Sequence, residues 1–305
     1  MKLFAILDID HPMVAWEVAI GRVLANSITD AEGVEYPVPS LWLYNNIYSS
    51  INDKFMSDLR SEFYIEKIRA DKFPDKPSRL NGAFFFESKE DAIKACEMWE
   101  WESKIDYISE VDFNETSYIK LDSNWITLRI RCCEKSELNE FIEQYYRGDE
   151  LFTDRPLNEI ICTGNGKILN NKLRRMAYKK ILQKKPEASF LLALGISCYE
   201  QDPIKYQDIF RILPCIHKTS DGSICGLFIT TLKHLDEDEI GVAKRAKRYI
   251  HNNGNETILI TPKLNRLGKP LRIIRPTNKN ILFSLDDLSP YFFKISEENY
   301  MRMIK

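Results

Sequence analysis

The chain has 305 residues and a mass of 35.7 kDa, and 44% of its residues are hydrophobic and 29% charged. This composition is typical of a folded globular protein and excludes a disordered or fibrous chain. No run of about 18 apolar residues occurs, and the short apolar start is followed by acidic residues. We therefore expect no membrane span and no signal sequence, and a cytoplasmic location.

The two halves of the chain carry opposite charge. Residues 1–150 hold 17 lysines and arginines against 29 aspartates and glutamates, a net charge of −12, whereas residues 151–305 hold 26 against 16, a net charge of +10. We expect an acidic domain over 1–150 and a basic domain over 151–305. Two explanations stay open: opposite charges hold the domains together, or the basic half contacts nucleic acid while the acidic half carries the chemistry.

In the acidic half, the spacing of apolar residues, caps and proline-rich breaks predict the elements. Strands are expected at 3–9, 62–69, 83–88, 106–113 and 124–132, and helices at 14–25, 40–60, 88–101 and 136–146. Ser88, three residues before Asp91, is expected to cap the third of these helices.

In the basic half, a strand at 158–164 is expected to turn at 163–167 into a basic helix at 167–185. A buried helix at 189–201, strands or short apolar segments near 209–217 and 224–232, and a polar helix at 236–252 follow. Helices and strands mix without strict alternation, so the prediction is an α+β fold and not a doubly wound sheet.

Metal and hydrolase motifs are weak in this sequence. The four histidines are scattered and the seven cysteines never form CxxC, so we expect no metal site and reduced thiols. Asp8 and Asp10 end a strand, as in the phosphatase superfamily, but His11 and Pro12 replace the residues that normally follow. We therefore expect a solvated strand end there. The TGNGK segment at 163–167 lacks the spacing of a phosphate-binding loop.

The segment 62–130 carries the strongest chemical signal. A predicted strand ends in Arg69, a two-proline loop presents Ser78 and Arg79, and an aromatic strand with Phe84 and Phe86 follows. Two guanidinium groups beside a hydroxyl suit a pyrophosphate, because each can bind phosphate oxygens in a bidentate way.

This order of residues resembles the ADP-ribosyltransferase fold, with its RNA 2′-phosphotransferase and DNA-modifying relatives. The matching pieces are Arg69 at a strand end, Ser78-Arg79 before the aromatic strand, Glu90-Asp91-Ala92 in the next helix, Glu110-Val111-Asp112 in an acidic strand, and Asp122-Ser123-Asn124-Trp125. The resemblance covers about seventy residues. It implies an ADP-ribosyltransferase-like mixed sheet core, followed by the second, basic α/β domain.

The resemblance also implies an activity, in which the nicotinamide–ribose bond of NAD is broken. Arg69 and Arg79 would bind the pyrophosphate or ribose, and Phe84 or Phe86 would stack near the nicotinamide. Glu110, with Ser78, would act on the transition state, and Glu134 and Glu143 remain alternatives for the catalytic carboxylate. The family further implies a toxin or phage-defence setting, and with it an inhibitory partner protein.

The acceptor is suggested by the basic half. Arg174, Arg175, Lys179 and Lys180 lie on the predicted helix 167–185, and further cations lie at 244–248 and 263–275. Such a surface would bind nucleic acid through its phosphates. The alternative to the enzyme is a non-enzymatic interaction protein, in which the opposite charges of the halves only organise assembly.

Overall fold

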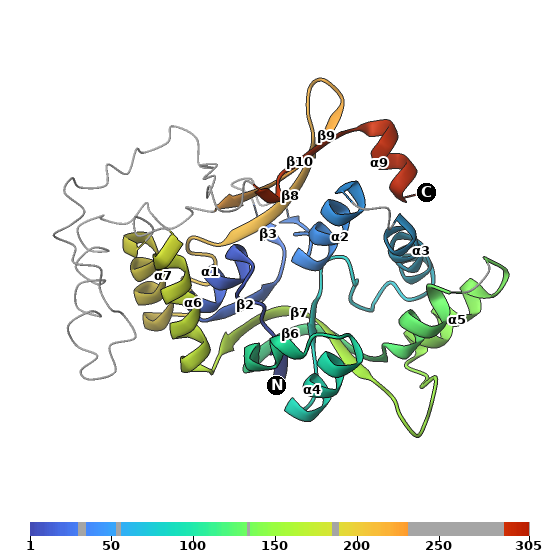
Figure 1. The fold of residues 1–305 in the computed structure, drawn as a ribbon, viewed down its shortest axis with the longest axis horizontal. Helices are drawn as coiled ribbons and strands as arrows, with labels where there is room; N and C mark the ends of the chain where they lie inside the picture. The colour runs from blue at the N-terminus through green and yellow to red at the C-terminus, as the bar shows by residue number, and fades with distance from the viewer. Residues whose placement is uncertain (30–34, 53–55, 133–134, 185–188, 231–289, 305) are drawn as a thin grey trace.

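The computed structural model describes residues 1–29, 35–52, 56–132, 135–184, 189–230 and 290–304. Its centre is a five-stranded antiparallel sheet with the order β1-β6-β7-β2, in which β5 also pairs with β7 (Figure 1). The strands are β1 (Lys2–Ile6), β2 (Arg22–Ala25), β5 (Ala83–Phe85), β6 (Ile108–Asp122) and β7 (Asn158–Ile168).

Strands β6 and β7 form the longest pair of the sheet and set its curvature. Their register shifts between Glu115 and Ser117, and such a bulge bends a strand. At the far edge, the backbone of Phe86, just after β5, exchanges hydrogen bonds of 2.8 and 2.9 Å with Phe4 of β1. The sheet thus curls until its first strand meets β5.

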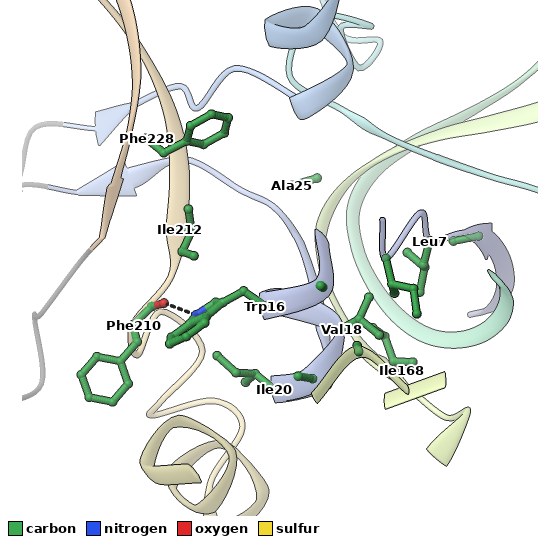
Figure 2. Packing of buried hydrophobic residues seen from close by; sticks show 14 of the residues in the cluster. Leu7, Trp16, Val18, Ile20, Ala25, Ile168, Phe210, Ile212 and Phe228 are labelled. Carbon is green, nitrogen blue, oxygen red and sulfur yellow. Dashed lines mark hydrogen bonds between the residues drawn. The ribbon is translucent and has the colours of Figure 1, made fainter. Parts of the chain in front are cut away.

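One face of the sheet is covered by the larger hydrophobic cluster. It packs helices α1 (Pro12–Ile20), α2 (Leu41–Asn52), α6 (Asn171–Lys184) and α7 (Ser189–Gln201) on residues such as Phe85 and Phe113. Trp16 lies within this cluster, and its indole N–H donates to the carbonyl of Phe210 at 2.9 Å (Figure 2). The buried polar group is therefore satisfied.

The opposite face carries two smaller clusters. Helices α3 (Met56–Lys72) and α5 (Lys135–Arg147) pack on Phe84 and Ile161, and α4 (Lys89–Met98) packs on Phe86 and Ile108. Phe84 and Phe85 face opposite sides because side chains alternate along a strand. The two-proline loop 73–82 joins α3 to β5 and lies between α3 and the sheet edge.

A second sheet has the order β10-β9-β8, from β8 (Ile212–Lys218), β9 (Ser223–Thr230) and β10 (Phe293–Ser296). The last helix, α9 (Glu297–Ile304), follows β10 and meets α3, where the Arg60 guanidinium donates to the carbonyl of Arg302. The short strands β3 (Ile28–Thr29) and β4 (Glu35–Tyr36) pair with each other. The molecule is an α+β protein with antiparallel sheets.

Many predicted elements are confirmed, including β1, β5, the helices α2, α4, α5, α6 and α7, and the strands β8 and β9. The Ser88 hydroxyl caps α4 by accepting from the Asp91 N–H at 3.0 Å. The predicted helix 236–252 lies outside the described residues.

Several described segments differ from the prediction. The helix expected at 40–60 is divided between α2 and the start of α3. Residues 62–69 belong to α3, because Ile65 and Ile68 reach the core at helical spacing despite their strand propensity. The helix expected at 14–25 ends at Ile20, where Gly21 adopts φ +105°, and residues 22–25 form β2. The strand expected at 124–132 is replaced by a π-helical turn, Ile126–Ile130.

The expected turn at 163–167 is instead the second part of β7. Its two glycines allow close pairing: a Cβ on Gly164 would lie 2.2 Å from the Asn114 carbonyl oxygen, and one on Gly166 would lie 2.5 Å from the Phe113 ring. Strand β6 belongs to the half 1–150 and strand β7 to the half 151–305. Because the two strands pair, the central sheet is built from both halves of the chain.

Within the described residues, no helix is long and apolar enough to cross a bilayer. The same residues contain no group of three or more histidine, cysteine or carboxylate side chains arranged to hold a metal ion. Six cysteines are described, and all are free thiols.

Candidate functional site

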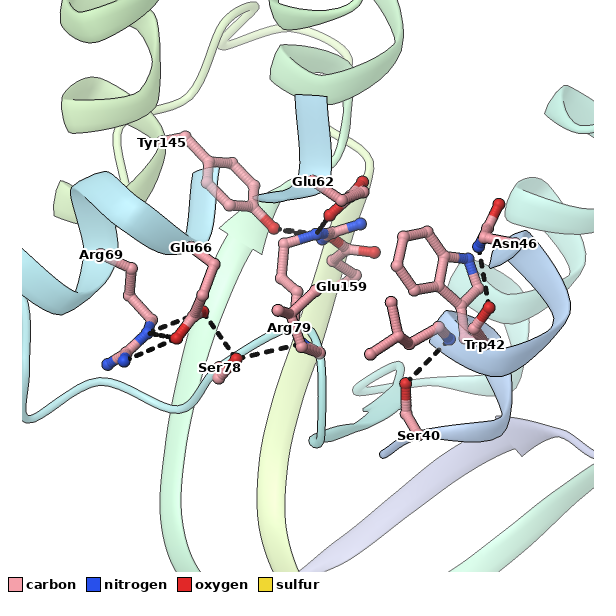
Figure 3. Close-up of polar contacts among 12 residues, drawn as sticks. Ser40, Trp42, Asn46, Glu62, Glu66, Arg69, Ser78, Arg79, Tyr145 and Glu159 are labelled. Carbon is pink, nitrogen blue, oxygen red and sulfur yellow. Dashed lines mark hydrogen bonds and ion pairs between the residues drawn. The ribbon is translucent and has the colours of Figure 1, made fainter. Parts of the chain in front are cut away.

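Arg79, in the loop before β5, is the centre of a buried polar cluster. Its side chain is 6% exposed; Nε donates to Glu62 at 2.9 Å, and Nη1 donates to Glu159 and to the Tyr145 hydroxyl, both at 2.5 Å (Figure 3). Tyr145 in turn donates to Glu159 at 2.8 Å. The cluster therefore joins the loop, α3, α5 and β7 at one point.

Aromatic rings surround the Arg79 guanidinium. Its central carbon lies 5.0 Å from the ring centroid of Phe84, 5.5 Å from that of Trp42 and 5.7 Å from that of Tyr145. Trp42 and Phe84 contact each other, with centroids 5.8 Å apart, and both are only partly buried. The two rings form an aromatic cover over the Arg79 guanidinium.

Helix α2 brings Trp42 to this place because its first turn is tied to the arginine loop. The Ser40 N–H donates to the Leu80 carbonyl at 2.8 Å, and the Ser40 hydroxyl caps the helix by accepting from the Leu43 N–H at 3.1 Å. The position of Trp42 over Arg79 is thus fixed by backbone contacts and not by the ring alone.

Two carboxylates, Glu62 and Glu159, contact the guanidinium of Arg79. Arg131 forms a second, longer ion pair with Glu62 at 3.6 Å, and its side chain is 29% exposed. Burial by itself lowers the pKa of Arg79, but Glu62, Tyr145 and Glu159 outweigh it and hold the pKa well above its ordinary value. Burial raises the pKa of Tyr145. Arg79 is therefore cationic and Tyr145 is neutral.

Arg69 and Ser78 do not lie free beside Arg79. Arg69, in the last turn of α3, pairs with Glu66 at 2.8 Å and donates to the carbonyls of Phe73 and Lys76, the latter at 2.9 Å. The Ser78 hydroxyl donates to Glu66 at 2.6 Å. Both residues hold the two-proline loop in place. The predicted pair of guanidinium groups on one pyrophosphate is therefore not what these contacts provide.

The other predicted residues of the site are separated from Arg79. Phe86 is 3% exposed and packs under α4 against Trp99, with centroids 6.1 Å apart. Glu110 lies opposite Phe4 in the sheet and pairs with Lys2 at 3.1 Å. Glu143 pairs with Lys72 at 2.5 Å, and Glu134 lies outside the described residues. Only Phe84 joins Arg79.

The residues that do join Arg79 were missed in the sequence. Glu62 lies in a segment expected to be a strand, and Trp42 and Tyr145 are spaced as ordinary core residues of helices. Glu159 had a usable signal, because a charged residue in the buried strand NEIICTG needs a partner. Nothing in the sequence indicates that its partner is Arg79, 80 positions earlier.

Asp8 and Asp10, at the end of β1, are half exposed and already paired. The Lys104 ammonium contacts Asp8 at 2.9 Å and Asp10 at 2.6 Å, and Lys180 also contacts Asp10. Hydrogen bonds from Lys104 and Lys180 hold the pKa of Asp10 well below its ordinary range. The strand end is solvated and its carboxylates are neutralised by lysines.

The residues predicted to bind nucleic acid lie on α6 but do not form one exposed group. Arg174 is 3% exposed, pairs with Glu200 at 2.5 Å and donates to the Ile20 carbonyl at 2.9 Å. Lys180 pairs with Asp10, Arg175 is partly buried, and Lys179 is exposed. The cations at 244–248 and 263–275 lie outside the described residues.

Comparison of the chain with protein-family models gives no match, and comparison with curated proteins gives none.

Proposed function

We propose that the chain is an NAD-dependent ADP-ribosyltransferase whose nicotinamide site lies at Trp42, Phe84 and Arg79. The sequence resemblance over 62–130 supports the activity. The observation that carries the position is that two buried carboxylates, Glu62 and Glu159, lie beside Arg79 and beneath the partly exposed rings of Trp42 and Phe84. This arrangement favours a flat, positively charged ring, and the nicotinamide of NAD is one.

In this proposal the carboxylate of Glu159 takes the role first expected of Glu110. The bond between the nicotinamide nitrogen and ribose C1′ breaks, and its electron pair leaves with neutral nicotinamide. Positive charge then develops on the ribose, where a fixed carboxylate stabilises it. A nucleophile of the acceptor forms the new bond to C1′, and its proton passes to a carboxylate. Arg79 orients Glu159, and Arg69 and Ser78 are positioning residues of the loop.

The test is an NAD-consumption assay with parallel binding measurements by calorimetry. Glu159→Gln should lower turnover about 100-fold, as the loss of one charge-stabilising group does, and leave NAD binding nearly unchanged. Trp42→Ala should weaken NAD binding about tenfold through loss of the stacking face. Glu110→Gln is the matched control, because the Glu110 carboxylate contacts Lys2 and not Arg79.

Two results would overturn the proposal. One is wild-type protein that neither binds nor consumes millimolar NAD while its unfolding transition is cooperative. The other is loss of turnover in Glu110→Gln with full turnover in Glu159→Gln, which would move the site back to β6.

For the acceptor we propose nucleic acid, bound through the exposed lysines of α6. Lys172, Lys179 and Lys184 are exposed, and no ion pair involves them among the residues described. Binding through phosphates would fall steeply with added salt. A filter-binding titration of single- and double-stranded oligonucleotides at two salt concentrations checks this. Absent binding, or binding that does not change with salt, would remove the acceptor and leave the NAD site untouched.

A further inference from the structure

Two exposed apolar side chains lie at the end of helix α4. Met98, its last residue, is 50% exposed, and Trp101, three residues later, is 46% exposed. Trp99 lies between them in the sequence, is partly buried, and meets Trp101 edge to face with ring centroids 5.3 Å apart. We call Met98, Trp99 and Trp101 the tryptophan ledge. Exposed aromatic side chains are enriched at protein interfaces.

The backbone fixes the direction of Trp101. The Trp101 N–H donates to the Cys96 carbonyl at 2.7 Å, which closes the end of α4, and Glu100 between them adopts φ +58°. Glycine is the usual residue in that left-handed conformation. This chain has Glu100 at that position, directly before Trp101 in the sequence.

Three carboxylates flank the ledge residues in the sequence. Glu97, Glu100 and Glu102 are exposed, and within the described part of the chain none forms an ion pair. The two lysines nearest in sequence are engaged elsewhere: Lys94 donates to the Pro156 carbonyl at 2.7 Å, and Lys104 binds Asp8 and Asp10. The segment 97–102 therefore combines an exposed indole with three exposed carboxylates.

We infer that the tryptophan ledge binds an arginine-rich segment of a partner protein. A guanidinium can stack on the face of an indole and at the same time form a bidentate pair with a carboxylate, and Trp101 with its neighbouring glutamates offers both partners. Lysine matches the charge but not the planar stacking. The ledge uses none of the residues assigned to the NAD site, so the two proposals stand or fall separately.

The test is the binding of a fluorescein-labelled nona-arginine peptide to the full chain, followed by fluorescence anisotropy. Trp101→Ala should weaken binding about tenfold, and a nona-lysine peptide should bind several-fold more weakly than nona-arginine. Ile204→Ala is the matched control, because Ile204 is 86% exposed and lies in a different part of the chain. It should leave binding unchanged.

A second variant tests the three carboxylates separately from the exposed indole. Glu97→Gln/Glu100→Gln/Glu102→Gln keeps side-chain size and should weaken nona-arginine binding at least tenfold, with a flatter salt dependence. The inference is overturned if wild-type protein does not bind the peptide, or if Trp101→Ala and the triple variant bind as wild type does. It is also overturned if sedimentation shows that Trp101→Ala only abolishes self-association, or if the ledge binds neutral phosphatidylcholine vesicles instead.

Discussion

Buried arginines occur in two regions of this protein, and their surroundings differ. One region centres on Arg79 and lies toward the α3–α5 end of the sheet; the other contains Arg22, Arg174 and Arg211 and lies toward α6 and α7 (Figure 1). All four arginine residues are at most 5% exposed. The difference lies in what their guanidinium groups contact.

The second region is balanced. Arg22 pairs with Glu17 at 2.5 Å, Arg211 with Asp208 at 3.0 Å and Arg174 with Glu200 at 2.5 Å. Each guanidinium also donates to a backbone carbonyl, at Gln207, Asn26 and Ile20 respectively. Each of these arginines thus has one carboxylate partner and one backbone acceptor. These contacts connect loops and helix ends.

The Arg79 region has a different composition. Among the described residues, the Arg79 guanidinium donates to side chains, namely Glu62, Glu159 and Tyr145, and partly exposed rings lie over it. Burial alone therefore does not distinguish the two regions. They differ in the partners of the guanidinium groups and in the aromatic rings that lie over Arg79.

The largest expected effect is the removal of Arg79. Arg79→Met would leave Glu159 buried without a cation and Glu62 with only the longer contact to Arg131, and it should cost about 3–5 kcal/mol of unfolding free energy. Urea denaturation followed by circular dichroism measures it. Arg69→Met is the comparison variant and should lose less, because Glu66 is 23% exposed and water can replace the guanidinium. Equal losses would contradict the special position of Arg79.

The stability of the second region is expected to depend on pH through His11. His11 caps α1, the helix that contains Glu17, and its Nδ1 accepts from the Met13 N–H at 3.3 Å. Burial lowers the pKa of His11 to about 4, while the charge of Asp8 opposes the shift. The unfolded chain therefore binds the proton first. Stability is complete above about pH 6.5 and is lost as the pH falls toward 4, by roughly 3 kcal/mol in full.

The measurement is the unfolding free energy between pH 7 and pH 4 for wild type and His11→Asn. Asparagine also caps helices, so the variant keeps an acceptor and loses the titration. The difference between the two curves isolates His11 from the carboxylates that titrate below pH 5. Parallel curves would show that His11 is not protonated on unfolding.

The sequence could predict much of the fold but only fragments of the site. Helices α2 and α4 and the aromatic strand β5 carry local signals, a cap or a periodicity, that fix them without tertiary context. The segment 62–69 does not, because its isoleucines and aromatics favour a strand until the core selects a helix. Because 62–69 is predicted as a strand, the sequence does not indicate that Glu62 contacts Arg79 or that Glu66 contacts Ser78.

The remainder depends on contacts between distant residues. Glu159 reaches Arg79 because β5 pairs with β7, a register that no local pattern in either segment specifies. The charge split of the halves was visible in the composition, yet β7 from the basic half lies inside the same sheet as β6. The composition of the two halves gives their net charge, but it does not indicate which strands pair.

The contribution of the carboxylates is tested by replacing one carboxylate in each region with its amide, Glu159 beside Arg79 and Glu17 beside Arg22. Glu159→Gln keeps an acceptor for Tyr145 and leaves Glu62 to neutralise Arg79, so it should cost less than about 1 kcal/mol. Glu17→Gln removes the only carboxylate that contacts Arg22 among the described residues and should cost about 2–3 kcal/mol. Thermal or urea unfolding of both variants measures this. The reverse order would show that the Arg79 region is the structural one.

The last prediction concerns the packing around Arg174 in the region of Arg22, Arg174 and Arg211. Gly21, at φ +105°, ends α1, and a Cβ there would lie 2.6 Å from the guanidinium carbon of Arg174. Gly21→Ala should therefore cost about 2 kcal/mol, from the left-handed backbone together with displacement of Arg174. Gly222→Ala, at φ +82° with nothing within 4 Å, carries the backbone cost alone, about 1 kcal/mol. The difference between the two unfolding free energies measures how firmly Glu200 and the Ile20 carbonyl hold Arg174. If the two variants lose the same amount, the guanidinium moves aside freely, and this region is less rigid than its buried ion pairs imply.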